Sequence, residues 1–311
     1  MSGMFELYDR NGRIGAIETD TAITVGVFDG VHRGHQALLK QLSTANCQLS
    51  TLIVTLTAHP SFILGRRDSE YWLDDPEEHL RLLFKAGAEY VAVLPFTREV
   101  AQLSACEMAR LLYKELRMRA LLMGYDSRFG SKQKDDFDRL PLLAAELGFT
   151  IERGNPFTVD GDPISSSRIR ESLTSGNVAA TANLLGRNYS ITGSVLHGRS
   201  VGRTLGFPTA NIDLTGTRKM LPANGVYAVQ LSILNSQFST LKGMANLGAA
   251  PTFSVDKPTL EVHLLDFDGD LSGQTVEVQF IHRMREIVRF DSAEALQHQL
   301  QQDLEQIKQW S

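Results

Sequence analysis

The chain contains 311 residues, of which 42% are hydrophobic and 22% charged, and its formal net charge is −5 at pH 7. This length predicts about two globular domains. The excess of acidic residues argues against a main function in binding nucleic acid. Because no apolar run reaches the roughly 18 residues that a transmembrane helix needs, we expect no membrane span and no membrane partner.

The two cysteines, Cys47 and Cys106, lie far apart and match no metal-ligand spacing. They are most simply explained as thiols of a reducing compartment. Residues 1–10 contain no long apolar core of the kind found in a secretory signal peptide. The sequence therefore predicts a cytoplasmic protein, and we expect it to be a monomer or a weak oligomer.

Strand and helix patterns alternate through the first half of the chain. Apolar, β-branched runs predict buried strands at 22–25, 51–56, 90–94, 120–123 and 150–152. Helices are expected between them, since Asp75 and Pro76 form a helix start, Ser104 and Glu107 form a capping box, and Gly148 is a helix stop. The alternation predicts an α/β fold, with a parallel sheet covered by helices on both faces. Ligands then bind at the carboxyl ends of the strands.

The stretch GVFDGVHRGHQ connects the first predicted strand to a helix. Its glycines, Gly26, Gly30 and Gly34, allow a sharp turn and a close approach to a ligand. A helix that begins near Gly34 directs free N–H groups and its positive dipole end at a phosphate. His32 and His35 would stand beside that phosphate as imidazole donors. The order H-x-G-H is typical of nucleotidyltransferases, and the alternative is a glycine-rich turn with two solvated histidines.

Other predicted strands of this half also lead into residues suited to nucleotide binding. His59 follows the second strand, and Asp126 and Arg128 follow the fourth. A later helix opens with the run SSSRIR, whose hydroxyls, N–H groups and Arg168 would bind a second anion. The serines of this run are Ser165, Ser166 and Ser167. Each residue alone could be a cap, a turn or a surface cation, but together, at one edge of the sheet, they favour a nucleotide site.

The pattern changes near residue 185. A helix there ends at Gly186, so we expect one domain over 1–184 and a second over 185–311. Short alternating strands separated by turn residues then predict an antiparallel barrel. The clearest strands are 189–196, 226–234, 238–245, 259–265 and 275–281. A last helix is expected over 292–310, with an apolar stripe that we interpret as a packing face.

The loop after the first barrel strand, HGRSVGRTLGFPTAN, combines glycines with basic side chains. Glycine-rich backbone and nearby cations suit phosphates, although loop arginines are often simply solvated. The residues of this loop expected to contact nucleotide are His197, Gly198, Gly202, Arg203, Gly206 and Pro208.

Taken together, the motifs resemble the bacterial bifunctional riboflavin kinase/FAD synthetase family over nearly the whole chain. The resemblance rests on the H-x-G-H turn, the H-P pair that begins at His59, the turn at 124–130, the run SSSRIR and GFPTAN at 206–211. It implies a Rossmann-like nucleotidyltransferase domain that acts as an FMN adenylyltransferase, followed by a small β-barrel that acts as a riboflavin kinase. Riboflavin, FMN and ATP would be the substrates, FMN and FAD the products, and Mg²⁺ the cofactor.

The resemblance also implies roles for residues of the barrel. The Thr209 hydroxyl and the Asn211 carbonyl would bind Mg²⁺, which prefers oxygen ligands. Glu261 would be the base, because a primary hydroxyl is a poor nucleophile until a carboxylate accepts its proton. Arg285 would contribute to binding. On residue type alone, Glu261 could equally be a solvated strand residue.

In the first domain, His32 and His35 would, with Arg168, stabilise the charge on the triphosphate as pyrophosphate leaves. Further residues of the same turn expected to bind nucleotide are Gly26, Phe28, Asp29 and Gly34.

Two other interpretations remain open. One is a monofunctional enzyme in which one module has lost its activity. The other is a regulator that binds flavin or nucleotide without catalysis. Such a regulator should have lost Glu261 or an imidazole of the H-x-G-H turn, and all three side chains are present.

Overall fold

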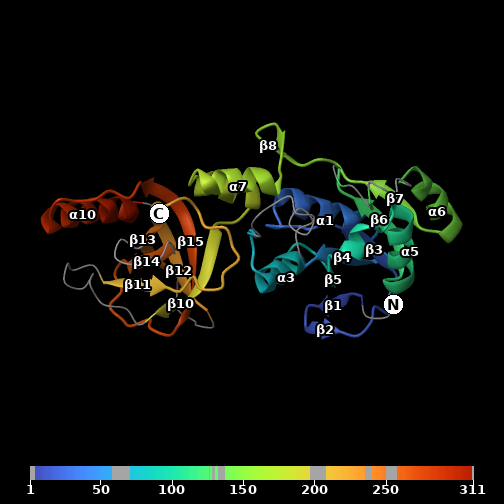
Figure 1. The fold of residues 1–311 in the computed structure, drawn as a ribbon, viewed down its shortest axis with the longest axis horizontal. Coiled ribbons are helices and arrows are strands. Elements are labelled where there is room, and N and C mark those ends of the chain that lie inside the picture. The colour runs from blue at the N-terminus through green and yellow to red at the C-terminus, as the bar shows by residue number, and fades with distance from the viewer. Residues whose placement is uncertain are drawn as a thin grey trace. The chain divides into compact units, whose positions relative to one another are not determined.

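The computed structural model (Figure 1) describes residues 4–57, 71–125, 127, 130–131, 137–196, 208–234, 240–249 and 258–309. The chain divides into two compact units, Met1–Ser166 and Ser167–Ser311. The predicted boundary between 184 and 185 differs from this division by two helices, α7 (Ser166–Thr174) and α8 (Val178–Leu185). Apart from Ser166, both helices belong to the second unit: the Leu173 carbonyl accepts a hydrogen bond from the Ala223 N–H, and α8 packs on two barrel strands.

The first unit is built on a seven-stranded sheet in the order β2-β1-β5-β4-β3-β6-β7. Its strands are β1 Glu6–Asp9, β2 Gly12–Ile14, β3 Thr21–Val25, β4 Ser50–Leu56, β5 Tyr90–Leu94, β6 Met118–Met123 and β7 Thr150–Arg153. Strands β5, β4, β3, β6 and β7 pair in parallel, whereas β1 pairs antiparallel with both β2 and β5. The predicted parallel strands are therefore confirmed, and the antiparallel β1–β2 edge was not predicted.

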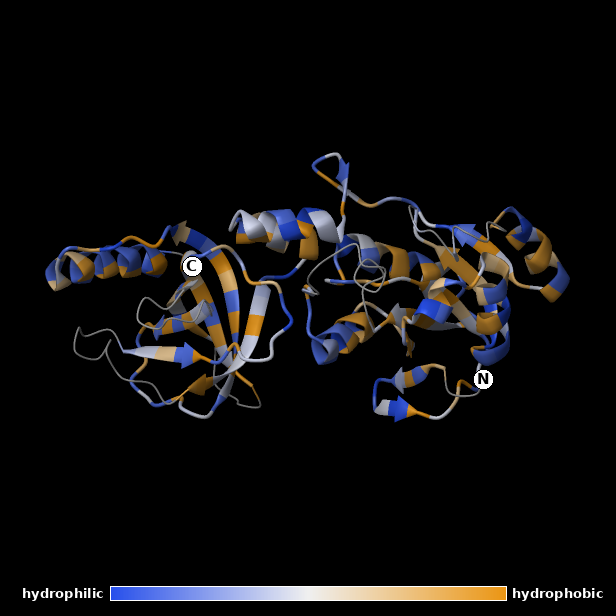
Figure 2. Ribbon diagram, viewed as in Figure 1, coloured by the Kyte–Doolittle hydropathy of each residue, from blue (hydrophilic) through white to orange (hydrophobic). Residues whose placement is uncertain are grey.

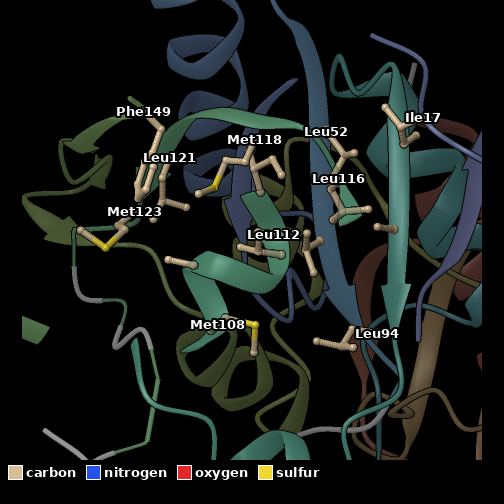
Figure 3. Packing of buried hydrophobic residues seen from close by; sticks show 14 of the residues in the cluster. Ile17, Leu52, Leu94, Met108, Leu112, Leu116, Met118, Leu121, Met123 and Phe149 are labelled. Carbon is tan, nitrogen blue, oxygen red and sulfur yellow. The ribbon is translucent and has the colours of Figure 1, made fainter. Parts of the chain in front are cut away.

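Helices cover both faces of this sheet, as predicted. They are α1 Arg33–Ala45, α3 Pro76–Lys85, α4 Arg98–Ala101, α5 Ala105–Glu115 and α6 Leu140–Leu147, with a 3-10 turn at Phe137–Arg139 and a small hairpin of β8 Thr158–Val159 and β9 Asp162–Pro163. Successive side chains of a strand point to opposite faces. Leu52 and Val54 thus pack toward α5 and α6 in the cluster shown in Figure 3, while Ile53 packs toward α1 and α3.

The second unit contains a closed antiparallel barrel in the order β10-β11-β14-β13-β12-β15. Its strands are β10 Tyr189–Leu196, β11 Thr209–Ile212, β12 Gly225–Ile233, β13 Leu241–Ala249, β14 Pro258–Leu264 and β15 Thr275–Arg285. The predicted barrel is confirmed. The sequence did not predict β11, which is only four residues long, and the start of the strand predicted at 238–245 lies outside the described residues.

The last helix, α10 (Ala293–Gln309), packs on the outside of this barrel. Leu304 and Ile307 form a buried cluster with Val226, Met244 and Leu265, and Leu300 packs against it, so the predicted packing face is confirmed. Figure 2 shows the same alternation of hydrophobic and hydrophilic residues along α10 and along the barrel strands. Within the described part of the chain, no helix combines the length and apolarity that crossing a bilayer requires.

Candidate active sites

The H-x-G-H turn leaves the carboxyl end of β3 and enters α1 through a strained backbone. Phe28 has a φ of +53°, Gly30 of +83° and Val31 of +35°. A non-glycine residue at positive φ costs on the order of 1–3 kcal/mol and persists only where the surroundings hold it. The Gly26 N–H donates to the Val54 carbonyl (3.0 Å) and the Val31 N–H to the Phe28 carbonyl (2.8 Å), which fixes both ends of the turn.

The two histidines of the motif stack on each other at the start of α1. Their ring centroids lie 3.5 Å apart with planes inclined by 17°, and the edge of Phe28 contacts His35 with centroids 5.1 Å apart. His32 is the N-cap, and its Nδ1 accepts a hydrogen bond from the His35 N–H (3.3 Å). His32 is only 5% exposed, so the alternative of two solvated histidines is wrong.

Burial, and to a lesser degree the charges of His32 and His79, hold the pKa of His35 well below its ordinary value of 6.5. In the described part of the protein, its buried Nδ1 has no hydrogen-bond partner. A buried polar atom without a partner is costly, with a penalty of about 1–3 kcal/mol. At neutral pH His35 is therefore an uncharged imidazole, and the described protein leaves its Nδ1 without a hydrogen-bond partner.

The three glycines of the turn act in different ways. Gly30 alone among them needs a positive φ. A Cβ at Gly26 would lie 3.0 Å from the Phe28 ring, and a Cβ at Gly34 would lie 3.1 Å from His32 Nδ1. The prediction that all three enable a sharp turn therefore holds for Gly30, whereas Gly26 and Gly34 make room for aromatic rings.

Asp29 and Ser166 meet at the same turn. The Ser166 hydroxyl donates to the Asp29 carbonyl (3.0 Å), and both residues belong to the first unit. The Asp29 carboxylate is 2% exposed and accepts the Leu73 N–H (2.8 Å). Asp29 thus stabilises the backbone of the turn, and direct contact between its carboxylate and a nucleotide stays a prediction.

The remaining predicted residues of the nucleotide site fall into two groups. Ser165 is half-buried just before α7, while Ser167 and Arg168 lie on α7 within the second unit, so their shared role stays a prediction. Several other predicted binding residues of both sites lie outside the described residues: His59, Asp126, Arg128, His197, Gly198, Gly202, Arg203 and Gly206.

The predicted kinase residues form a row on one face of the barrel. Asn211 of β11 is paired with Glu261 of β14, and Glu261 is paired with Asn246 of β13. Side chains directly opposite on neighbouring strands share a face. The neighbouring Leu260 and Val262 are buried in the barrel, so the row lies on its outer face. Burial raises the pKa of Glu261 above its ordinary value of 4.5, which makes it a better proton acceptor.

Thr209 and His263 extend this row by one further pair. Thr209 is exposed and Asn211 half-buried, and the two residues share the outer face because they lie two apart on β11. The His263 Nδ1–H donates to the Pro208 carbonyl (2.8 Å), which fixes the segment that carries Thr209. Sequence reasoning did not assign a role to His263. Its spacing of two from Glu261 was the available signal, because alternate residues of a strand share a face.

Arg285 was predicted to contribute to binding, but its guanidinium is engaged within the protein. It donates to both carboxylate oxygens of Asp303 on α10, with the shortest distance 2.7 Å from Nη2 to Oδ2. Asp303 is 2% exposed and also accepts from Gln299 Nε2 (2.9 Å). Arg285 therefore fixes α10 to the end of β15, and its contact with a ligand stays a prediction.

A mostly parallel sheet whose strand β3 leads through an H-x-G-H turn into a helix is the arrangement of nucleotidyltransferases. Comparison with family models agrees: residues 15–168 match the model described as FAD synthetase, and residues 185–311 match the model described as riboflavin kinase.

Relatives that match nearly the whole chain contain both halves in a single protein. A protein of Haemophilus influenzae named bifunctional riboflavin kinase/FMN adenylyltransferase is 36% identical over 300 residues, which cover 92% of this chain and 93% of the relative. A protein of the same name from Escherichia coli K12 is 38% identical and covers 90% of each chain. A crystal structure of a macrolide-efflux protein from Streptococcus pneumoniae, 32% identical, superimposes with a TM-score of 0.87 over 95% of this chain and 96% of that chain.

The chain belongs to the bifunctional riboflavin kinase/FMN adenylyltransferase family. It is an ATP-using enzyme that makes FMN and FAD.

Proposed function

We propose that each unit catalyses one of the two reactions with its own ATP. In the barrel, the riboflavin hydroxyl attacks the γ-phosphorus of ATP, so that FMN forms and ADP leaves. At the H-x-G-H turn, a phosphate oxygen of FMN attacks the α-phosphorus of a second ATP, so that FAD forms and pyrophosphate leaves. Neither step needs a covalent enzyme intermediate, and positioning with charge neutralisation supplies most of the acceleration.

The observation that carries the adenylyl assignment is the stacked histidine pair at the N-terminus of α1. The helix start presents the positive end of the helix dipole, which favours phosphate. His35 offers a buried ring nitrogen that the described protein leaves without a partner. Because its pKa is lowered in the free protein, a bound triphosphate would favour uptake of a proton by His35, and the resulting imidazolium would neutralise charge as pyrophosphate leaves.

The observation that carries the kinase assignment is the row formed by Thr209, Asn211 and Glu261. Glu261 accepts the proton of the riboflavin hydroxyl, a contribution of roughly 10²–10⁴-fold for a positioned base. The raised pKa of its carboxyl group suits this role.

The same row fits Mg²⁺. The Thr209 hydroxyl and the Asn211 carbonyl are oxygen donors on one face of β11, with the Glu261 carboxylate opposite Asn211. Magnesium prefers oxygen ligands and is commonly held by few protein groups together with substrate phosphates. When bound, the ion would neutralise charge on the transferring phosphoryl group, while Thr209 and Asn211 would orient it.

Two predicted properties accompany this proposal. A cytoplasmic location agrees with the use of ATP and with two free cysteines, Cys47 and Cys106. The protein would act as a monomer or a weak oligomer.

The test is to incubate purified protein with riboflavin, ATP and Mg²⁺ and to separate the flavins by chromatography. FMN followed by FAD is expected. FMN alone, or no turnover until FMN is supplied, would instead identify a monofunctional enzyme. In the same assay His35→Ala should abolish FAD formation and leave FMN formation normal, whereas an unchanged rate of FAD formation would refute the role of the histidine pair.

A further inference from the structure

Two aspartates from distant segments hold each other's backbone beside the H-x-G-H turn. The Asp29 carboxylate accepts the Leu73 N–H (2.8 Å), and the Asp74 carboxylate accepts a short hydrogen bond from the Gly30 N–H. Asp29 and Asp74 are 2% and 3% exposed. Two adjacent residues of the segment before α3, Leu73 and Asp74, are thereby hydrogen-bonded to two adjacent residues of the turn, Asp29 and Gly30.

His79, in the first turns of α3, extends this connection. Its Nδ1 lies 2.6 Å from Asp74 Oδ2, and its Nε2 lies 3.0 Å from the Thr55 hydroxyl on β4. The Thr55 hydroxyl in turn donates to the Val27 carbonyl (3.2 Å). The connection therefore leaves the turn at Gly30 and returns to it at Val27. We call the chain Gly30–Asp74–His79–Thr55–Val27 the turn clamp.

The carboxylate of Asp74 can only accept hydrogen bonds, so it accepts from Nδ1–H of His79. The side chain of Asp74 is fully buried and that of His79 is 13% exposed, so this contact lies largely out of water.

The turn needs such a support because its backbone is strained. Phe28 and Val31 both have a positive φ, and Val31 is β-branched, for which this conformation is especially unfavourable. Gly30 lies between these two residues, and its N–H is the group that Asp74 holds. Val31 is followed directly by His32, so relaxation of the turn would move the stacked imidazoles.

We propose that Asp74 and His79 are positioning residues for adenylyl transfer: they hold the turn so that His32 and His35 face the triphosphate. Neither residue touches the substrate. The proposal rests on the role of the histidine pair given above and adds the group that fixes its geometry. A displacement of about 1 Å at a reacting centre can cost on the order of 100-fold in rate.

Two substitutions of His79 each keep one of its two side-chain hydrogen bonds and remove the other. Asn places an amide nitrogen where Nδ1 is and keeps the bond to Asp74, while Gln reaches the position of Nε2 and keeps the bond to Thr55. His79→Gln should lower kcat for FAD formation by about 10- to 100-fold with little change in KM for ATP, since Asp74 loses its anchor. His79→Asn should retain most of the wild-type kcat.

Riboflavin phosphorylation, which we assign to the other unit, measures the amount of enzyme in each sample. Urea unfolding of the same samples measures whether the first unit, which carries the substitution, is folded. Arg81→Gln, at an exposed residue of the same helix, is the matched control and should leave both activities unchanged. Asp74→Ala should reproduce the His79→Gln defect, and it keeps His79 in place if the latter variant folds poorly.

A wild-type kcat in His79→Gln, or equal losses in the Asn and Gln variants, would overturn the turn clamp. Equal losses would mean that the contact between His79 and Asp74 only adds stability. These failures are distinct from failure of the proposed function, which would be seen as normal FAD formation by His35→Ala.

Discussion

The two candidate sites are built in opposite ways. In the first unit, a strained turn crowds its groups together, with His32 stacked on His35. In the second, Asn211, Glu261 and Asn246 are spaced across unstrained strands in regular register. A turn can aim several N–H groups at one phosphate but requires rare backbone conformations. A strand aims every second side chain at one face but offers few free N–H groups. We therefore expect the turn to be sensitive to shape and the barrel face to be sensitive to loss of single functional groups.

Loss of the Glu261 carboxylate is expected to have the largest effect, and only on the reaction of the barrel. Glu261→Gln keeps the shape of the side chain and removes the base, so riboflavin phosphorylation should fall by roughly 10²–10⁴-fold. Adenylylation of supplied FMN should be unchanged. Initial rates of both reactions measure this, with the exposed Asp268→Asn as control. Equal loss of both activities would mean that the two units do not act separately.

A methyl group added to the turn tests its sensitivity to shape. In Gly34→Ala the new Cβ would lie 3.1 Å from His32 Nδ1 and displace the stacked ring. FAD formation should fall by about 10-fold, although Ala favours the helix over Gly. Gly15→Ala is the control, since nothing lies within 4 Å of a Cβ there. If the two variants have the same FAD synthesis rate, the stacking of the histidines is not needed.

The Arg285–Asp303 pair tests whether a predicted binding residue is structural. Removal of one partner of a buried pair leaves an uncompensated charge, so Arg285→Ala should destabilise the protein by about 3 kcal/mol. Asp303→Ala should do the same. The double variant should be no worse than either, with a coupling energy of up to about 3 kcal/mol. Urea unfolding of the four proteins measures this, and additive losses would show that the two side chains act independently.

The pH dependence of stability tests the lowered pKa of His35. Because the pKa of His35 is lowered in the folded state, the unfolded chain binds a proton first as the pH falls below about 6.5. Stability should therefore decrease toward acid, by at most about 1.4 kcal/mol per pH unit for one proton. His35→Asn should remove this contribution. Urea unfolding of both proteins at pH 7.5, 6.5 and 5.5 compares the slopes of stability against pH. Identical slopes would contradict a lowered pKa of His35.

Much of the fold could be predicted from local patterns. The capping box of α5 is present as expected, with Ser104 Oγ accepting from Glu107 N–H (3.1 Å) and Glu107 Oε2 accepting from Ser104 N–H (2.8 Å). Such contacts join residues three apart, so a short stretch of sequence contains both partners. The β1–β2 edge and β11 were missed because strands of three or four residues give too little alternation to recognise.

The kind of chemistry at both sites could be predicted, because the motifs H-x-G-H and GFPTAN contain the imidazoles and the oxygen donors. The residues that support those groups could not be predicted. Asp74 lies 44 residues from Gly30, and His263 lies 55 residues from Pro208. Nothing in the neighbouring sequence marks these residues as partners.

The sequence by itself determined which segments become helices and strands and which residues can carry phosphate chemistry, because both depend on side chains close together along the chain. Only the tertiary structure decided that the pKa of His35 is lowered, that Arg285 is bound to Asp303, and that Asp74 and His79 contact each other beside the turn. These properties depend on burial and on contacts between distant segments, and those exist only once the sheet and the barrel have formed.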